Sequence, residues 1–184
     1  MVEAGSLAGS LQPVVVAGNG LALRPWAIDD APAVVRAFTD PDIQHWHFRR
    51  YETLAEAQVW INSELEGWSS ERAVSWAIVR MDSDAVLGRV AIYPNLQDGY
   101  GEVTYWVLPD ARGQRIATRA TVAATKWAHD LGLHRVQLEH STRNEASRGV
   151  AERAGFVSEG VRRAANLHDD GWHDMHLYSH LSTD

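Results

Sequence analysis

The chain has 184 residues, 45% of them hydrophobic, which is enough for one domain with a complete core. Its formal net charge of −7 argues against nucleic acid as a general partner, because no excess of cations is available to displace counterions from phosphates. The absence of cysteine excludes disulfides and zinc–thiolate sites. No apolar run of about 18 residues occurs, so a membrane span is excluded. Residues 1–12 also lack the basic start and apolar centre of a secretion signal, so we expect a cytoplasmic protein.

The first half of the chain is expected to form strands and two amphipathic helices after a flexible tail at residues 1–12. The predicted elements of the domain at 13–184 begin with a hairpin (14–16 and 21–23), a helix from Asp29 or Asp30 to Phe38, a helix from Thr53 to Leu65, and strands at 74–79 and 85–93. The aspartate and threonine side chains can accept hydrogen bonds from the first free N–H groups of the helices.

The second half continues the alternation of strands and helices. The predicted elements are a strand ending at Leu108, a long helix with an apolar stripe at Ile116, Ala120, Ala124, Trp127 and Leu131, a strand at 136–138, a helix at 145–153, and a hairpin with strands at 156–165 and 172–181. Gly132 ends the long helix. The pattern predicts a mixed sheet flanked by helices, in a single α/β domain.

Residues 106–118 form the most informative stretch. A β-prone run ends at Pro109, a turn with Gly113 follows, and an amphipathic helix begins after it. Backbone N–H groups gather where a strand, a glycine turn and a helix start follow one another, and the helix dipole adds positive potential there. Such a concavity suits a phosphate or a pyrophosphate. A local basic cluster can also meet an anionic cofactor: Arg112, Arg115, Arg119 and Lys126.

Four groups of residues resemble a known family. Arg112-Gly113-Gln114 followed by Ile116-Ala117-Thr118 is similar to an acyl-CoA-binding loop, although Asp110 and Arg115 depart from its usual pattern. The further similarities are Asn144–Ser147 with Val150–Phe156 and Glu159-Gly160, the strand Gly101–Trp106, and the opening Leu23–Pro25 with Asp29–Ala31. From about residue 20 onward the chain resembles the Gcn5-related N-acetyltransferase (GNAT) family, in particular its ribosomal-protein N-acetyltransferase branch.

The resemblance implies a fold and a cofactor site. The fold is a single GNAT-type α/β domain with a central mixed, mostly antiparallel twisted sheet of about seven strands, flanked by helices and splayed at the CoA site. The implied cofactor-binding residues are Trp106, Val107, Leu108, Arg112, Gly113, Gln114, Arg115, Ile116, Ala117, Thr118, Asn144 and Ser147. The implied acyl donor is acetyl-CoA, and no metal is expected.

Acetyl transfer to an amine requires a bound thioester, a neutral amine and stabilisation of an oxyanion. By resemblance, the Val107 N–H donates to the oxyanion and Ser147 protonates the leaving thiolate; otherwise Ser147 is a solvated helix serine. Glu102 is either a base acting through water or an edge charge paired with an arginine. Some members of the branch carry a glutamate where this chain has Asn166, and an amide cannot act as a base.

The acceptor site is expected after the first helix. The segment Gln44–Arg50, which follows this helix, is aromatic and basic. The candidate substrate residues are His45 and His47 of this segment, together with Asn166. The alternative is a loop in which Trp46 and Phe48 fill the core.

Two other groups of residues are weaker indications of a functional site. His168, Asp169, Asp170, His173, Asp174 and His176 resemble a metal cluster, but His173 and His176 face opposite sides of a strand. His134, His140 and Ser141 with nearby carboxylates suggest a hydrolase triad, yet the sequence has no Gly-x-Ser-x-Gly elbow.

These features predict an N-acetyltransferase that works by direct transfer in a ternary complex. The expected acceptor is a primary amine, either a protein N-terminus or a small molecule. The alternatives are a non-catalytic acyl-CoA sensor and an enzyme for another acyl-CoA, such as succinyl-CoA, with Arg49, Arg50 or His47 meeting the carboxylate. An unpaired strand edge near the C-terminus can support a homodimer.

Overall fold

A central sheet organises the molecule in the computed structural model, which describes residues 2, 5–47 and 49–184. Its strands are β1 (Val15–Gly18), β2 (Leu21–Pro25), β3 (Val74–Arg80), β4 (Val86–Asn95), β5 (Tyr100–Val107), β6 (Arg135–Ser141), β7 (Val157–His168) and β8 (Gly171–Leu181). They form one eight-stranded sheet in the order β1-β2-β3-β4-β5-β6-β8-β7. The β5–β6 pair is parallel and the other pairs are antiparallel. The expected mixed, mostly antiparallel sheet is confirmed, with eight strands instead of about seven.

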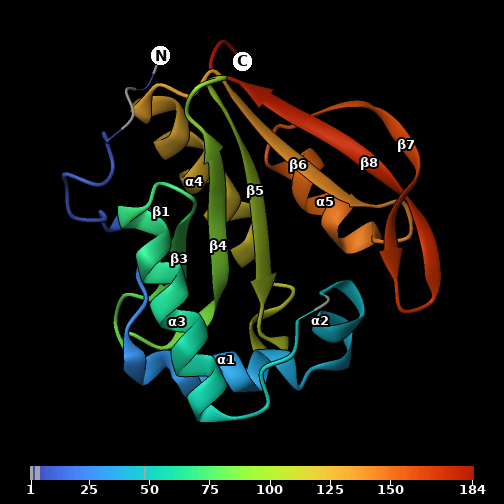
Figure 1. Cartoon of the computed structure of the whole chain (residues 1–184). Coiled ribbons are helices and arrows are strands. Elements are labelled where there is room, and N and C mark those ends of the chain that lie inside the picture. Colours follow the sequence, from blue (N-terminus) through green and yellow to red (C-terminus); the bar gives the residue numbers. More distant parts are fainter. Residues whose placement is uncertain (1, 3–4, 48) are drawn as a thin grey trace.

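Helices cover both faces of the sheet (Figure 1). They are α1 (Ala31–Phe38), α2 (Pro41–Trp46), α3 (Leu54–Ser69), α4 (Ile116–Leu131) and α5 (Glu145–Arg153). Thr53 caps α3, because its side chain accepts from the Glu56 N–H while the Glu56 carboxylate accepts from the Thr53 N–H. Gly132 ends α4 with φ 111°, a left-handed conformation that favours glycine. Both boundaries agree with the sequence-based expectation.

The α2 helix was not predicted. The sequence offered the segment from Gln44 to Arg50 as part of an acceptor site or, alternatively, as a loop, and its first part is the end of a helix. The Asp40 side chain accepts from the Ile43 N–H at 3.0 Å, and Pro41 occupies the first helical position. Phe48, expected to fill the core, lies outside the described residues.

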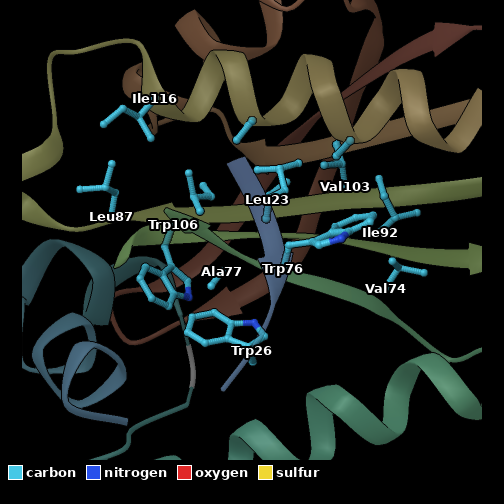
Figure 2. Packing of buried hydrophobic residues seen from close by; sticks show 14 of the residues in the cluster. Leu23, Trp26, Val74, Trp76, Ala77, Leu87, Ile92, Val103, Trp106 and Ile116 are labelled. Carbon is cyan, nitrogen blue, oxygen red and sulfur yellow. The ribbon is translucent and has the colours of Figure 1, made fainter. Parts of the chain in front are cut away.

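The hydrophobic core lies on both sides of the sheet. Figure 2 shows Val103 and Ile116 between the sheet and α4, and Trp26 with Trp106 on the opposite side. Trp26 and Trp106 lie with ring centroids 6.1 Å apart. Among the described residues, none of the helices has the length and hydropathy needed to cross a membrane.

The described part of residues 1–12 packs against the domain. Leu7 is buried, and the Glu71 carboxylate accepts from the N–H groups of Gly5 and Leu7 at 2.7 and 2.8 Å. The indole of Trp68 donates to the Ser10 carbonyl at 2.7 Å. Polar and apolar contacts therefore both hold this segment.

Candidate active site

A cavity of about 950 Å³ opens where β5 and β6 part. The two strands pair through Tyr100–Glu102 and Arg135–Gln137 alone and then diverge, as Figure 1 shows. The predicted site residues that line the cavity are His47, Trp106, Val107, Arg112, Gly113, Arg115, Ile116, Ala117, Thr118, Asn144, Ser147 and Asn166. The structure thus brings most of the predicted site together at the splayed strands.

The backbone of β5 presents alternate peptide groups to this opening. The Leu108 N–H donates to the Leu87 carbonyl of the β4 side at 2.9 Å. Since hydrogen-bonded and non-bonded pairs alternate in an antiparallel ladder, the peptide groups of Val107 and Tyr105 point away from β4 and towards the cavity. Only some of the backbone groups that we expected to contact the cofactor therefore face the cavity. Val107 faces the opening, whereas the N–H groups of Trp106 and Leu108 face β4, and Leu108 is not a lining residue.

The loop before α4 forms a concavity of N–H groups. Gly113 has φ 75° and Arg115 has φ 57°, so two left-handed residues stand directly before the helix. In the described part of the chain, α4 has no side-chain cap, whereas side chains cap α2, α3 and α5. Thr118, in the first turn of α4, has a buried Oγ1 with no hydrogen-bond partner among the described residues. Uncapped N–H groups and an unpaired hydroxyl beside a cavity fit an anionic ligand.

The basic cluster expected around this loop is largely engaged with protein groups. Arg112 donates to Asp40 and Asp42, which ties the loop to α2. Arg119 donates to the Gln114 carbonyl at 3.0 Å. Gln114 itself is not a lining residue, and its amide donates to the Asp110 carbonyl at 3.3 Å.

Lys126, another member of that cluster, lies on the exposed surface of α4. The Lys126 ammonium donates to both carboxylate oxygens of Asp130, at 2.9 and 2.7 Å. Lys126 does not line the cavity.

Asn144 and Ser147 lie together at the start of α5. The Asn144 Oδ1 caps the helix by accepting from the Ser147 N–H at 2.9 Å, so only the amide NH₂ of Asn144 is left to donate to a ligand. The Ser147 hydroxyl lies 2.7 Å from the Tyr105 hydroxyl, a partner that the sequence did not indicate. Burial raises the pKa of Tyr105 to about 12. Tyr105 therefore stays protonated near neutral pH and can donate to Ser147.

Glu102 is not among the cavity-lining residues. It is exposed, but the surrounding protein partly desolvates its carboxylate, and together with the nearby charge of Glu139 this raises its pKa above the usual value for glutamate. Arg162 acts in the opposite direction. Glu102 thus lies outside the cavity lining but close to Glu139, which is part of it.

His47 lies beside a buried ion pair. Arg89 and Glu64 are both buried, with 2.5 Å between guanidinium nitrogen and carboxylate oxygen. Desolvation of the imidazole, followed by the charges of Arg89 and Arg50, lowers the pKa of His47 to about 4. His47 is therefore neutral at physiological pH. His45 is not a lining residue, and its ring lies 4.3 Å from that of Trp46.

Asn166 lines the cavity from β7 and pairs directly with His173 of β8. The sequence singled out His173 only as a member of a doubtful metal cluster. Here its ring is buried and hydrogen-bonded to Ser141 and Asp170. Local sequence patterns could not find this group, because more than 30 residues separate Ser141 from His173.

Comparisons with known proteins agree with this geometry. A family model described as acetyltransferase (GNAT) domain matches residues 21–157. The uncharacterized N-acetyltransferase YoaA of Bacillus subtilis is 24% identical over 162 residues, which cover 86% of this chain and 92% of that protein.

Two solved structures share the fold. The ribosomal-protein-S5-alanine acetyltransferase of Vibrio fischeri superposes with a TM-score of 0.82 at 22% identity, covering 94% of this chain and 98% of the other. The microcin C7 self-immunity acetyltransferase MccE, in complex with acetyl-CoA and AMP, superposes with a TM-score of 0.79 at 19% identity, covering 90% of this chain and 94% of the other. With the family model matching well over half of its length, this chain belongs to the GNAT acetyltransferase family and is an acyltransferase.

Proposed function

We propose that this chain is an acetyl-CoA-dependent N-acetyltransferase that moves an acetyl group directly to a primary amine in a ternary complex. The observation that carries the proposal is the parting of β5 from β6 beside an uncapped helix start. Peptide groups of Val107 and Tyr105 lie along the opening for a pantetheine arm, and the first N–H groups of α4 are available for a diphosphate. A cavity of about 950 Å³ has room for both groups.

Three groups of the chain serve the chemistry. When bound, acetyl-CoA supplies a thioester carbonyl. The Val107 N–H donates to the oxygen of that carbonyl as negative charge develops on it. Ser147 gives a proton to the departing thiolate, and the Tyr105 hydroxyl donates to Ser147 Oγ so that the serine proton points away from the tyrosine. The Asn144 NH₂ binds the pantetheine arm.

The acceptor enters between α2 and the β7–β8 turn. Arg50 of the segment after α2 reaches Asp169 of that turn, at 3.2 Å. The net charge of −7 favours a cationic acceptor. The name of the Vibrio fischeri structure points to a protein N-terminus as one class, and small primary amines are the other. We expect the reaction to take place in the cytoplasm.

A carboxylate-bearing acyl group, such as succinyl, is less well matched to this site. His47 is neutral near pH 7 because its pKa is about 4, so it offers no positive charge. Arg50 is already paired with Asp169. Arg49 and Arg50 do not line the cavity, so acetyl is the acyl group that we propose.

Thiol release from acetyl-CoA tests the proposal. The acceptors are tetrapeptides with N-terminal alanine or serine, and spermidine as a small polyamine. We expect CoA release that depends on an acceptor, and acetylated product by mass spectrometry. Calorimetry with CoA accompanies the assay. Binding of CoA without thiol release would indicate a sensor, and no heat with CoA would overturn the proposal altogether.

A further inference from the structure

A chain of three hydrogen-bonded side chains runs from the cavity wall to the β7–β8 turn. Ser141 ends β6 and lines the cavity, and its Oγ lies 2.8 Å from Nδ1 of His173. The Nε2 of His173 lies 2.7 Å from Oδ1 of Asp170. Ser141 and His173 are 2% and 1% exposed. The middle of this hydrogen-bonded series is thus shielded from bulk water. One end of the series, Ser141, borders the cavity, and the other end, Asp170, reaches the surface.

The hydrogen-bond partners determine the direction in which a proton can move along these three side chains. Two groups contact Nε2 of His173: the Asp170 carboxylate, which only accepts hydrogen bonds, and the Arg143 guanidinium, which only donates them. In the tautomer that donates to Asp170, Nε2 carries the proton. Nδ1 of the neutral ring is then an acceptor, and the Ser141 hydroxyl donates to it. The Ser141 oxygen accepts in turn from the Arg143 N–H at 3.1 Å. A proton can therefore pass from the cavity through the serine to the imidazole.

Charged and titratable groups surround the imidazole on several sides. The Arg143 guanidinium lies 2.9 Å from His173 Nε2 and 2.9 Å from Asp170 Oδ2. The ring of His168 stacks at 4.3 Å, and that of His45 in α2 lies at 6.4 Å. Although desolvation acts to raise it, the hydrogen bond from His173 keeps the pKa of Asp170 below its usual value. Asp170 thus remains ionised, and its negative charge and the positive charge of Arg143 both face the ring of His173.

The residues that the sequence suggested near the acceptor do not supply a base in the cavity. Asn166 lines the cavity directly across the ladder from His173, and an amide cannot take up a proton. His47, with a pKa of about 4, is too weak a base near pH 7. Glu102 does not line the cavity.

We propose that Ser141, His173 and Asp170 form a proton relay that deprotonates the incoming amine, an inference that rests on the acetyl transfer proposed above. The ammonium of the acceptor gives a proton to Ser141 Oγ as Ser141 gives its own proton to His173 Nδ1. The amine becomes neutral, the serine is unchanged, and an imidazolium paired with Asp170 remains.

The rest of the reaction balances without another reactant. The neutral amine attacks the thioester, a C–N bond forms and the C–S bond breaks. Ser147 gives its proton to the thiolate and takes up the proton that leaves the nitrogen at this stage, so Ser147 is unchanged. His173 then releases the first proton to solvent, beside Asp170, whose side chain is 43% exposed.

Steady-state kinetics of Ser141→Ala and His173→Gln test the relay, with acetyl-CoA and the best acceptor of the peptide and spermidine panel. We expect kcat to fall about 100-fold near neutral pH, the size of a general-base contribution. The KM for acetyl-CoA and the affinity for CoA stay within about twofold. The defect shrinks as the pH approaches the pKa of the amine, because the acceptor then arrives neutral. His176→Gln, a histidine of the same strand that is outside the cavity lining, is the matched control and keeps the wild-type profile.

The contrary outcomes are distinct. Full activity of Ser141→Ala, or a loss that is the same at every pH, would overturn the relay while leaving acetyl transfer in place. The same holds if Glu102→Gln, and not His173→Gln, shows the pH-dependent loss. Absence of transfer by the wild-type enzyme to every acceptor would instead contradict the function itself.

Imidazole ¹⁵N NMR of the free protein gives a readout independent of activity. We expect the His173 signal of the Nε2–H tautomer, with Nδ1 shifted as an acceptor, and we expect Ser141→Ala to remove that shift. A proton on Nδ1 would reverse the donor and the acceptor at Ser141 and refute the relay.

Discussion

Arg115 adopts a left-handed backbone conformation, φ 57°, at the residue directly before α4. A residue with a Cβ pays roughly 1 kcal/mol for this conformation, whereas glycine adopts it freely. We expect Arg115→Gly to raise the free energy of unfolding by about 1 kcal/mol, as measured by urea denaturation.

Arg115→Ala separates backbone strain from charge at this position. The alanine variant loses the guanidinium but keeps the Cβ, so we expect no gain in stability. Equal stabilisation by both substitutions would mean that the charge, and not the left-handed backbone, is the cause.

His47 links stability to pH. Its pKa is about 4 in the folded protein, against a usual value of about 6.5 in an unfolded chain. Between these values the unfolded state binds a proton that the folded state does not, so stability falls as the pH drops from about 6.5 to about 4. After allowance for solvent contact, we expect this loss to be on the order of 2 kcal/mol.

Urea denaturation of wild type and His47→Gln across this pH range measures the effect. The variant should lose this part of the pH dependence, and His134→Gln, at an exposed position, should keep it. Parallel curves for His47→Gln and wild type would contradict the assignment.

At the scale of elements, Asp40 serves two of them. Its carboxylate caps α2 through the Ile43 N–H and also accepts from Arg112 of the loop before α4. We expect Asp40→Ala to destabilise the protein by about 1 kcal/mol and to raise the KM of the acceptor more than that of acetyl-CoA, because α2 borders the acceptor entrance.

Asp40→Asn is the informative comparison, since asparagine is an equally good cap but carries no charge. It should retain most of the stability and show a smaller rise in the KM of the acceptor. If both variants behave alike in thermal unfolding and kinetics, the ion pair with Arg112 matters and the cap does not.

The elements also show what a sequence alone can predict. The apolar periodicity of α4 and the capping residue Thr53 were sufficient to predict α4 and the start of α3, because each signal lies within or directly beside one helix. The six-residue α2 offers one buried residue, Ile43, and so no apolar period, although Asp40-Pro41 carried a valid start signal.

The candidate site also has features that the sequence alone predicts and features that it does not. The phosphate loop follows from consecutive residues, so its position was predictable. The contact of Ser147 with Tyr105 crosses 42 residues and that of Ser141 with His173 crosses 32. The first contact joins α5 to β5 and the second joins β6 to β8, and no local pattern contains the information about which elements lie side by side.

At the scale of the whole molecule, three residue pairs of β5 and β6 join the two parts of the sheet. Few ladder bonds allow local opening, so in hydrogen exchange we expect amides of β7 and β8 to exchange faster than those of β3 and β4. A ligand in the cavity contacts both parts. CoA at about 100 times its Kd should add about 2.7 kcal/mol of stability and slow exchange in β6. Uniform protection of all strands without CoA would show that the sheet opens as one unit.

Lys126 is the sole lysine of the chain, and its ammonium donates hydrogen bonds to the Asp130 carboxylate on the outer side of α4. An enzyme that handles amines and activated acyl groups therefore presents one side-chain amine of its own to stray modification. Fluorophores or surface-coupling reagents directed at lysine would attach to the side chains at a single known address, outside the cavity, which makes this chain convenient for immobilised binding measurements.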